Sequence, residues 1–165
     1  MKNSFNISKG LLYIGVIGAG ECTEEEARLA EEVGCEIARR RAVLICGGRR
    51  GVMEAAARGA QRAGGLVVGI LPGSSRREGN PYLTVALPTG LGDARNAVIA
   101  CAADVFIAIS GGYGTLSEIA LALKMGKPVV GLFTWELTGR ERPFAVHRAK
   151  SAVEAVELAF QLASL

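Results

Sequence analysis

Three short apolar runs in this chain, residues 11–17, 42–46 and 105–109, each end in glycines and are followed by a helical pattern. The run at 105–109 is β-branched and aromatic and lacks polar alternation, as expected for a strand buried on both faces of a parallel sheet. Strands alternating with helices at this spacing predict an α/β fold with one Rossmann-like, doubly wound, mainly parallel sheet flanked by helices. A chain of 165 residues is expected to form it as a single domain, residues 1–165.

The order of elements follows from apolar periodicity and from glycine, proline and capping signals. We expect strands at residues 11–17, 42–46, 66–71, 84–87, 105–109 and 129–133. We expect a first helix that begins at Thr23 with a capping box, and a second that runs from Val52 to a stop at Gly64-Gly65. Three further helices are expected at residues 94–102, with Asp93 as the N-cap, at 116–125 and at 151–165. Residues 72–81 and 134–143 are expected to be loops. The three glycine turns should then meet at the carboxyl edge of the sheet, where such folds bind ligands.

The last glycine turn, Gly111-Gly112-Tyr113-Gly114-Thr115, has the character of a phosphate-binding loop. Its glycines allow a sharp turn and a close approach of the backbone to a ligand. The helix after it directs free N–H groups and a positive dipole end into the same space, so we expect an anion there. A structural alternative stays open, because Thr115 and Glu118 have the spacing of a capping box.

The other two turns bear on the identity of the ligand. Gly18 and Gly20 begin like a dinucleotide fingerprint, but Thr23 stands where the third glycine belongs, and no acidic residue follows the second strand. NAD is therefore not expected, NADP is disfavoured, and the lack of a Gly-Lys-Ser or Gly-Lys-Thr ending excludes a P-loop. The sequence favours a phosphate-bearing small molecule, because guanidinium groups bind phosphate in bidentate fashion and three lie near strand ends: Arg49, Arg50 and Arg95.

Composition argues against several other classes of protein. Nineteen basic and 16 acidic residues give a formal charge of +3, too small to indicate a nucleic-acid partner. His147 is the only histidine and has no ligand-spaced companion, so neither a metal site nor a resident cofactor is expected. The four cysteines lack Cys-x-x-Cys spacing and are expected to be buried thiols. With no signal-like start and no apolar run of transmembrane length, we expect a cytoplasmic protein without membrane contact.

Several ordered motifs resemble one family: Gly47-Gly48-x-x-Gly51-Val52-Met53, Gly64-Gly65-x-x-x-Gly69-Ile70-x-Pro72, Arg95, and Gly111-Gly112-Tyr113-Gly114-Thr115-x-x-Glu118. Over about residues 14–132 the chain resembles the Lonely Guy family and its "possible lysine decarboxylase" relatives. The resemblance implies a phosphoribohydrolase that splits a nucleoside 5′-monophosphate into free base and ribose 5-phosphate. The chain is also similar to a sister group that includes the molybdenum cofactor carrier proteins, which implies the alternative of a carrier or sensor that binds a phosphorylated pterin or nucleotide without turnover. A homodimer or higher homo-oligomer is implied as well.

The resemblance also implies roles for individual residues. Arg95 and Glu118 match the catalytic pair, and residues 111–115 match the 5′-phosphate site. Two departures from the family pattern bear on the substrate class, because Ser110 replaces a proline and Asn96 replaces a lysine. Further ligand contacts are expected at Gly18, Gly20, Gly47, Gly48, Arg49 and Met53.

The expected chemistry depends on Glu118. Cleavage of an N-glycosidic bond builds positive charge on the ribose, which a carboxylate beside the sugar stabilises. We expect Glu118 to be ionised because it lies near a helix N-terminus, and we expect Arg95 to orient both Glu118 and the sugar or base. In a carrier, Glu118 instead serves only as a cap and as an acceptor for a ligand hydroxyl.

Overall fold

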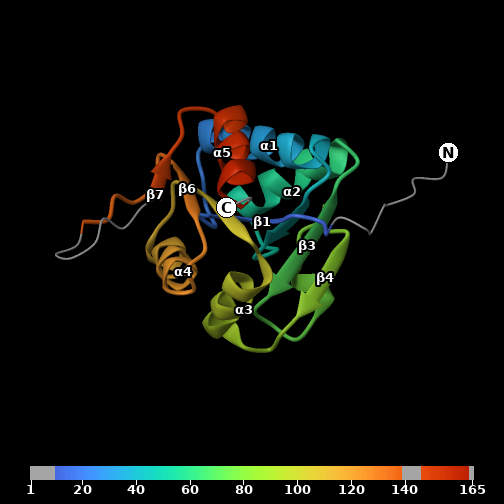
Figure 1. Ribbon diagram of the computed structural model, residues 1–165. Helices are drawn as coiled ribbons and strands as arrows, with labels where there is room; N and C mark the ends of the chain where they lie inside the picture. The colour runs from blue at the N-terminus through green and yellow to red at the C-terminus, as the bar shows by residue number, and fades with distance from the viewer. Residues whose placement is uncertain (1–9, 139–145, 164–165) are drawn as a thin grey trace.

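The computed structural model describes residues 10–138 and 146–163, and its seven strands form one parallel sheet (Figure 1). Across the sheet the strand order is β4-β3-β2-β1-β5-β6-β7. The strands are β1 (Tyr13–Gly18), β2 (Val43–Cys46), β3 (Leu66–Leu71), β4 (Val85–Pro88), β5 (Val105–Ile109), β6 (Val129–Leu132) and β7 (Val146–Arg148). Every residue of β2, β5 and β6 is buried, as expected for central strands covered on both faces. The predicted Rossmann-like α/β fold is confirmed.

Helices cover the two faces of the sheet (Figure 1). One face carries α1 (Glu24–Arg39), α2 (Val52–Arg62) and α5 (Ala152–Ala163), and the other carries α3 (Arg95–Ala102) and α4 (Tyr113–Lys124). Alternate residues of a central strand face opposite layers, so Val105 and Ile107 pack in the core under α1, α2 and α5, while Phe106 and Ala108 pack under α3 and α4. No helix in the described part of the chain has the length and apolar character needed to cross a bilayer.

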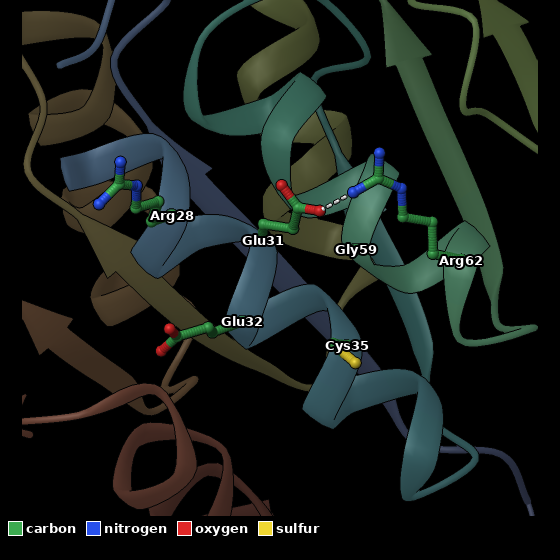
Figure 2. A pocket seen from close by; sticks show the side chains of 6 residues that line it. All are labelled: Arg28, Glu31, Glu32, Cys35, Gly59 and Arg62. Atoms are coloured by element: carbon green, nitrogen blue, oxygen red, sulfur yellow. Dashed lines mark hydrogen bonds and ion pairs between the residues drawn. The ribbon is translucent and has the colours of Figure 1, made fainter. Parts of the chain in front are cut away.

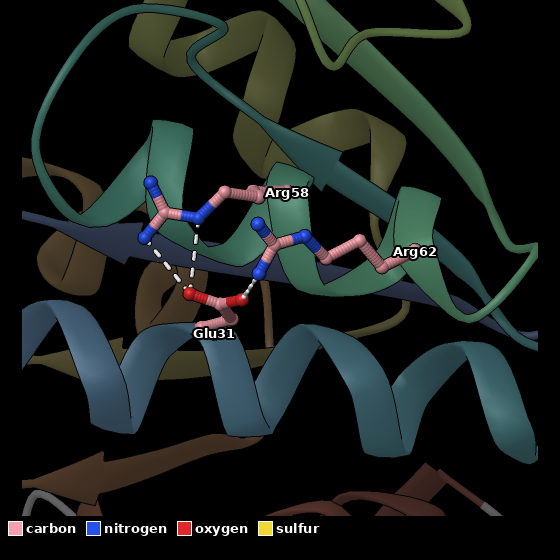
Figure 3. Close-up of polar contacts among 3 residues, drawn as sticks. All are labelled: Glu31, Arg58 and Arg62. Carbon is pink, nitrogen blue, oxygen red and sulfur yellow. Dashed lines mark hydrogen bonds and ion pairs between the residues drawn. The ribbon is translucent and has the colours of Figure 1, made fainter.

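Helices α1 and α2 pack closely because glycines lie at their contact. A Cβ on Gly34 would overlap the Ala56 carbonyl, and a Cβ on Gly59 would overlap the Glu31 carbonyl. The Glu31 carboxylate also joins the two helices, since it accepts from Arg58 Nε at 3.0 Å and pairs with Arg62 (Figure 3). The hydrogen bond from Arg58 is the main reason that the pKa of Glu31 lies below its ordinary value. The pair forms a rigid layer over β1 and β2.

The chain adds successive strands on one side of β1 and then, from β5 onward, on the other side, so the strand order reverses between β1 and β5. These two strands are paired from Ile14 with Val105 to Gly18 with Ile109. Strands β1 to β4 follow in order on one side of this point, and β5 to β7 follow on the other. A crevice at the carboxyl ends of the strands is the usual ligand site of such a sheet. The three glycine turns lie at this edge, as the sequence predicts.

Several local predictions are wrong. Asp93 does not cap α3, whose N-cap is Ala94 without a side-chain hydrogen bond, because a short 3₁₀ turn (Gly92–Ala94) precedes the helix. Helix α4 begins at Tyr113 rather than at residue 116. Strand β7 was not predicted, and it lies just beyond the predicted loop 134–143, of which residues 139–143 are outside the described residues.

Other local predictions have mixed outcomes. The capping box of Thr23 and Glu26 is confirmed, with hydrogen bonds of 2.9 and 3.2 Å. The predicted loop 72–81 contains a 3₁₀ turn (Arg76–Glu78). Of the four cysteines, only Cys46 is fully buried and Cys101 is exposed. The last two residues of the predicted helix 151–165, and residues 1–9 at the start of the chain, lie outside the described residues.

Candidate active and ligand-binding site

The ends of β1 and β5 approach each other so closely that the turn after β1 requires glycine. A Cβ on Gly18 would lie 2.6 Å from the Ile109 carbonyl oxygen, so no side chain fits there. Gly51, at a φ of 67°, packs against the backbone of Ala19 and Gly20, and Val52 N donates to Ala19 O at 3.0 Å. The first two glycine turns are therefore held together beside the third. A Cβ on Gly20 itself would meet no atom within 4 Å, so that position is open to a ligand.

The third turn, at residues 110–115, follows β5 and leads directly into α4. Gly112 is the N-cap of α4 and no side chain caps the helix, so Thr115 lies inside the first turn and not at the N-cap. Glu118 therefore forms no capping box, and the structural alternative for it is wrong. Gly111 has a φ of 108° and lies against the buried Thr115 side chain, which leaves no room for a Cβ. The first N–H groups of α4 have no intrahelical partner, as an anion site requires.

Ser110 takes a conformation that proline cannot adopt. Its φ is 50°, whereas the ring of proline fixes φ near −65°. The Ser110 N–H donates to Leu132 O at 3.0 Å, and its hydroxyl donates to the Glu26 carboxylate, which is the largest cause of the lowered pKa of Glu26. Because serine replaces the family's proline, this turn can adopt a positive φ at residue 110, and the Ser110 hydroxyl connects it to Glu26 in the first turn of α1.

Arg95, the first residue of α3, reaches under the ends of two other strands. Its Nη1 donates to the carbonyl oxygen of Gly47, directly after β2, and to the carbonyl oxygen of Ile70, within β3. Its Nε donates to Asn96 Oδ1 at 3.2 Å. Burial lowers the pKa of Arg95, and the nearby Glu118 raises it. Part of this guanidinium is thus used by the fold, and Nη2 has no protein partner in residues 10–138 and 146–163.

Glu118 is the one charged residue that is buried in the described core, with 8% of its surface exposed. Burial raises its pKa to about 7, although the positive charge of Arg95 acts to lower it. Within the described residues its carboxylate has neither a hydrogen bond nor an ion pair, so the two groups interact through their charges at a distance. The expectation that the helix N-terminus favours the ionised form of Glu118 is wrong, because residue 118 lies in the second turn of α4, where the helix dipole acts weakly, and burial dominates.

Asn96, which stands where the family has a lysine, connects α3 to α4. Its Nδ2 donates to Ser117 Oγ at 3.0 Å, and Ser117 Oγ donates to the Gly114 carbonyl at 2.7 Å. Its Oδ1 accepts from Arg95, as described above. A continuous chain of hydrogen bonds therefore runs from the Arg95 guanidinium to the glycine turn.

The turn after β2 contributes the remaining predicted residues. A Cβ on Gly47 would lie 2.7 Å from Met53 Sδ and 2.9 Å from Arg95 Nη1, so Gly47 allows these two side chains to meet. Gly48 is buried at a φ of 72°. Arg49 is exposed, and its carbonyl accepts from Asn80 Nδ2 at 2.9 Å, which attaches the 72–81 loop to this turn. The side chain of Arg49 is open to solvent beside the Arg95 charge.

The sequence analysis missed the residues that follow β6. Phe133 and Trp135 lie at the carboxyl end of that strand, and Trp135 Nε1 donates to the Gly112 carbonyl at 3.2 Å. The signal for them is positional: β5, which pairs with β6, already ends in residues of the predicted site, and the only tryptophan of the chain follows β6.

Outside this edge of the sheet, a cavity of about 300 Å³ lies on the outer surface of α1 and α2 (Figure 2). Its polar groups are in part already paired, because Glu31 binds Arg62 (Figure 2). No group of three or more His, Cys, Asp or Glu side chains in the described ranges is arranged to hold a metal ion.

A doubly wound parallel sheet with glycine turns at its reversal point defines a Rossmann-like α/β protein, with its candidate site at the carboxyl edge. Within that class the chain belongs to the SLOG cluster4 family, whose model matches residues 11–160. It is 52% identical over 122 residues to a protein of Archaeoglobus fulgidus, covering 74% of this chain and 80% of the relative. It is 35% identical over 106 residues to a cytokinin riboside 5′-monophosphate phosphoribohydrolase of Arabidopsis thaliana, covering 62% of this chain and 45% of the enzyme.

Several solved structures match nearly the whole chain. The molybdenum cofactor binding protein of Rippkaea orientalis is 40% identical with a TM-score of 0.86, covering 93% of this chain and 98% of that one. The molybdenum cofactor carrier protein of Chlamydomonas reinhardtii is 36% identical with a TM-score of 0.80, covering 94% and 99%. The family resemblance seen in the motifs is thus confirmed, for both of the groups that they suggest.

Proposed function

We propose that this chain binds and carries a phosphorylated, ring-bearing cofactor of the molybdenum cofactor type. The phosphate lies on the Gly111–Thr115 turn against the N–H groups of α4, and Arg95 Nη2 and Arg49 supply positive charge beside it. The remaining contacts come from Gly18, Gly20, Gly47, Gly48 and Met53, which border the same edge of the sheet.

The observation that carries this proposal is the Glu118 carboxyl, which is 8% exposed and lies near the positive charge of Arg95. Burial raises the pKa of Glu118 to about 7, which favours its neutral form more than in an ordinary glutamate. A neutral carboxyl both donates and accepts hydrogen bonds, which suits recognition of a polar group of the ligand such as a hydroxyl. Hydrolysis of a glycosidic bond needs a fixed negative charge opposite the sugar. The near full-length similarity to a carrier and to a binding protein for molybdenum cofactor supports the same proposal.

A second candidate is hydrolysis of a nucleoside 5′-monophosphate to free base and ribose 5-phosphate. It is favoured by the presence of both Arg95 and Glu118 on one face of the sheet and by the similarity to the plant phosphoribohydrolase. Here ionised Glu118 takes a proton from water, the hydroxyl oxygen bonds to C1′ as the C1′–N bond breaks, and the proton passes on to the released base. The rate should then rise with pH through about 7, as Glu118 ionises.

One experiment separates the two functions. Purified protein is tested by mass spectrometry for a co-purified phosphorylated pterin, and it is also incubated with a panel of nucleoside 5′-monophosphates while release of base is followed by chromatography. For the carrier we expect a bound pterin and no base release, with retention of the pterin in Glu118→Gln, which keeps the shape and the hydrogen bonds of the neutral acid. Base release that falls about 10²-fold or more in Glu118→Gln, but not in the exposed control Glu157→Gln, would establish hydrolysis instead.

We also propose that the chain forms a homodimer. Exposed apolar side chains support this, and they come from the edge strand β4, from the segment after it and from α3: Val85, Leu87, Leu91 and Val98. Light scattering of the purified protein tests it, since a monomer at micromolar concentration would contradict the proposal.

A further inference from the structure

Three aromatic side chains lie on the segments that follow β5 and β6, and we call them the aromatic patch: Tyr113, Phe133 and Trp135. Tyr113 is 84% exposed and Phe133 is 79% exposed, and Trp135 is half-buried. The rings of Tyr113 and Trp135 lie 5.9 Å apart between centroids, at 31° to each other. Large rings are seldom so open to solvent unless they meet a partner.

The aromatic patch is attached to the glycine turn by hydrogen bonds. Trp135 Nε1 donates to the Gly112 carbonyl at 3.2 Å, and Gly112 is the N-cap of α4. Thr134 Oγ1 donates to the Ser110 carbonyl at 2.6 Å. These bonds fix the segment after β6 and the Trp135 ring against the turn after β5.

The backbone beneath the aromatic patch is strained. Phe133 and Ser110 each have a φ of 50°, a region that bulky residues rarely adopt. The only other non-glycine residue with a positive φ in the described chain is Arg41, whose conformation closes the turn after α1 through a hydrogen bond to Ala38 O. Phe133 ends no helix, and its strained turn directs a large ring toward solvent. Strain of this kind gathers at ligand sites.

A cavity of about 440 Å³ adjoins the aromatic patch at the carboxyl ends of β6 and β7. Phe133 and Trp135 line it together with two cationic residues, Arg148 and Lys150. Arg148 is paired with Glu136 at 2.6 Å. A volume of this order suits a small organic molecule, and aromatic rings with a few polar groups are its usual lining.

We infer that the aromatic patch is a subsite for the planar heterocycle of the ligand whose phosphate binds at Gly111–Thr115. The inference rests on the proposed phosphate binding, but it does not depend on whether the ligand is carried or hydrolysed. Tyr113 and Glu118 are five residues apart on α4, about 140° around the helix axis. A ring stacked on the aromatic patch therefore lies on a different side of α4 from the carboxylate.

The test compares ligands with and without a heterocyclic base. Guanosine 5′-monophosphate is a suitable probe, because guanine and pterin share the same fused amino-oxo-pyrimidine edge, and ribose 5-phosphate is its base-free counterpart. Calorimetry gives both affinities for the wild type, for Tyr113→Ala and Phe133→Ala, and for the control Val153→Ala, which truncates an exposed apolar residue on α5. Fluorescence provides a second readout, since Trp135 is the only tryptophan.

We expect the nucleotide to bind at least about tenfold more tightly than ribose 5-phosphate, as stacking of one base provides, and to quench Trp135. The two aromatic variants should lose this base-dependent gain, while the affinity of Phe133→Ala for ribose 5-phosphate and all affinities of the control stay within twofold of the wild type. Equal affinity of the two probes for the wild type would overturn the subsite and leave the phosphate site standing. Binding of neither probe would overturn the proposed phosphate site, and the subsite with it.

Discussion

Replacement of Glu118 by glutamine should stabilise the protein at neutral and alkaline pH. The carboxyl of Glu118 has a pKa of about 7 in the folded chain, against 4.5 for an ordinary glutamate. As pH rises above 4.5, the unfolded chain releases this proton while the folded chain still holds it, so the folded state loses stability until pH passes about 7. At about 1.4 kcal/mol for each tenfold difference in proton affinity, the loss is about 3 kcal/mol. Glutamine stays neutral and escapes it.

The assay is urea denaturation of ligand-free wild type and Glu118→Gln, at pH values between 4.5 and 8. The free energy of unfolding of the variant, relative to wild type, should rise by about 3 kcal/mol across this range and level off above pH 7. Glu157→Gln, which replaces an exposed carboxylate on α5, should show no comparable trend. A constant difference between wild type and Glu118→Gln at every pH would refute the reasoning, because it would mean that burial does not hold the Glu118 proton.

Three further changes test other parts of the structure. Arg95→Met removes the charge that lowers the pKa of Glu118, so the pH-dependent loss of stability should shift above pH 7 in the same denaturation series, and should shift less in Arg95→Lys. Ser110→Pro restores the family's residue but cannot adopt a φ of 50°, so it should cost about 3 kcal/mol of stability, while Ser110→Gly should be tolerated. Gly34→Ala should cost about 3 kcal/mol in urea denaturation because its Cβ overlaps the Ala56 carbonyl, whereas Glu32→Ala on the exposed face of α1 should cost little.

The fold could be predicted because its signals are local. Each strand of the centre of the sheet is a short apolar run, and each turn at its carboxyl end is marked by glycines that the backbone requires, such as Gly18 and Gly111. Strand β7 gives no such signal, since Val146, His147 and Arg148 form neither an apolar run nor an alternation that stands out. It is defined by its pairing with β6, which is a tertiary contact.

The sequence predicted which residues form the candidate site, but not the helix start, the pKa of Glu118 or the contacts of Arg95. The spacing of Thr115 and Glu118 suggests a capping box, yet α4 starts three residues earlier than the pattern indicates, because Gly112 and not Thr115 begins it. The pKa of Glu118 depends on how deeply α3, α4 and the sheet bury it, which no local pattern contains. In the same way, the contacts of Arg95 with Gly47 and Ile70 join residues that are 48 and 25 positions away.

Unfavourable features gather at one edge of this molecule. Glu118 is a buried carboxyl whose pKa is raised to about 7 by burial, and Ser110 and Phe133 adopt positive φ angles. All three belong to elements that meet at the turn after β5. Selection for stability alone would remove each of them, with glutamine at 118 and glycine at 110 as simple solutions. Their presence together argues that this edge is shaped by a ligand, and that the free energy lost in the empty protein is recovered when the ligand binds.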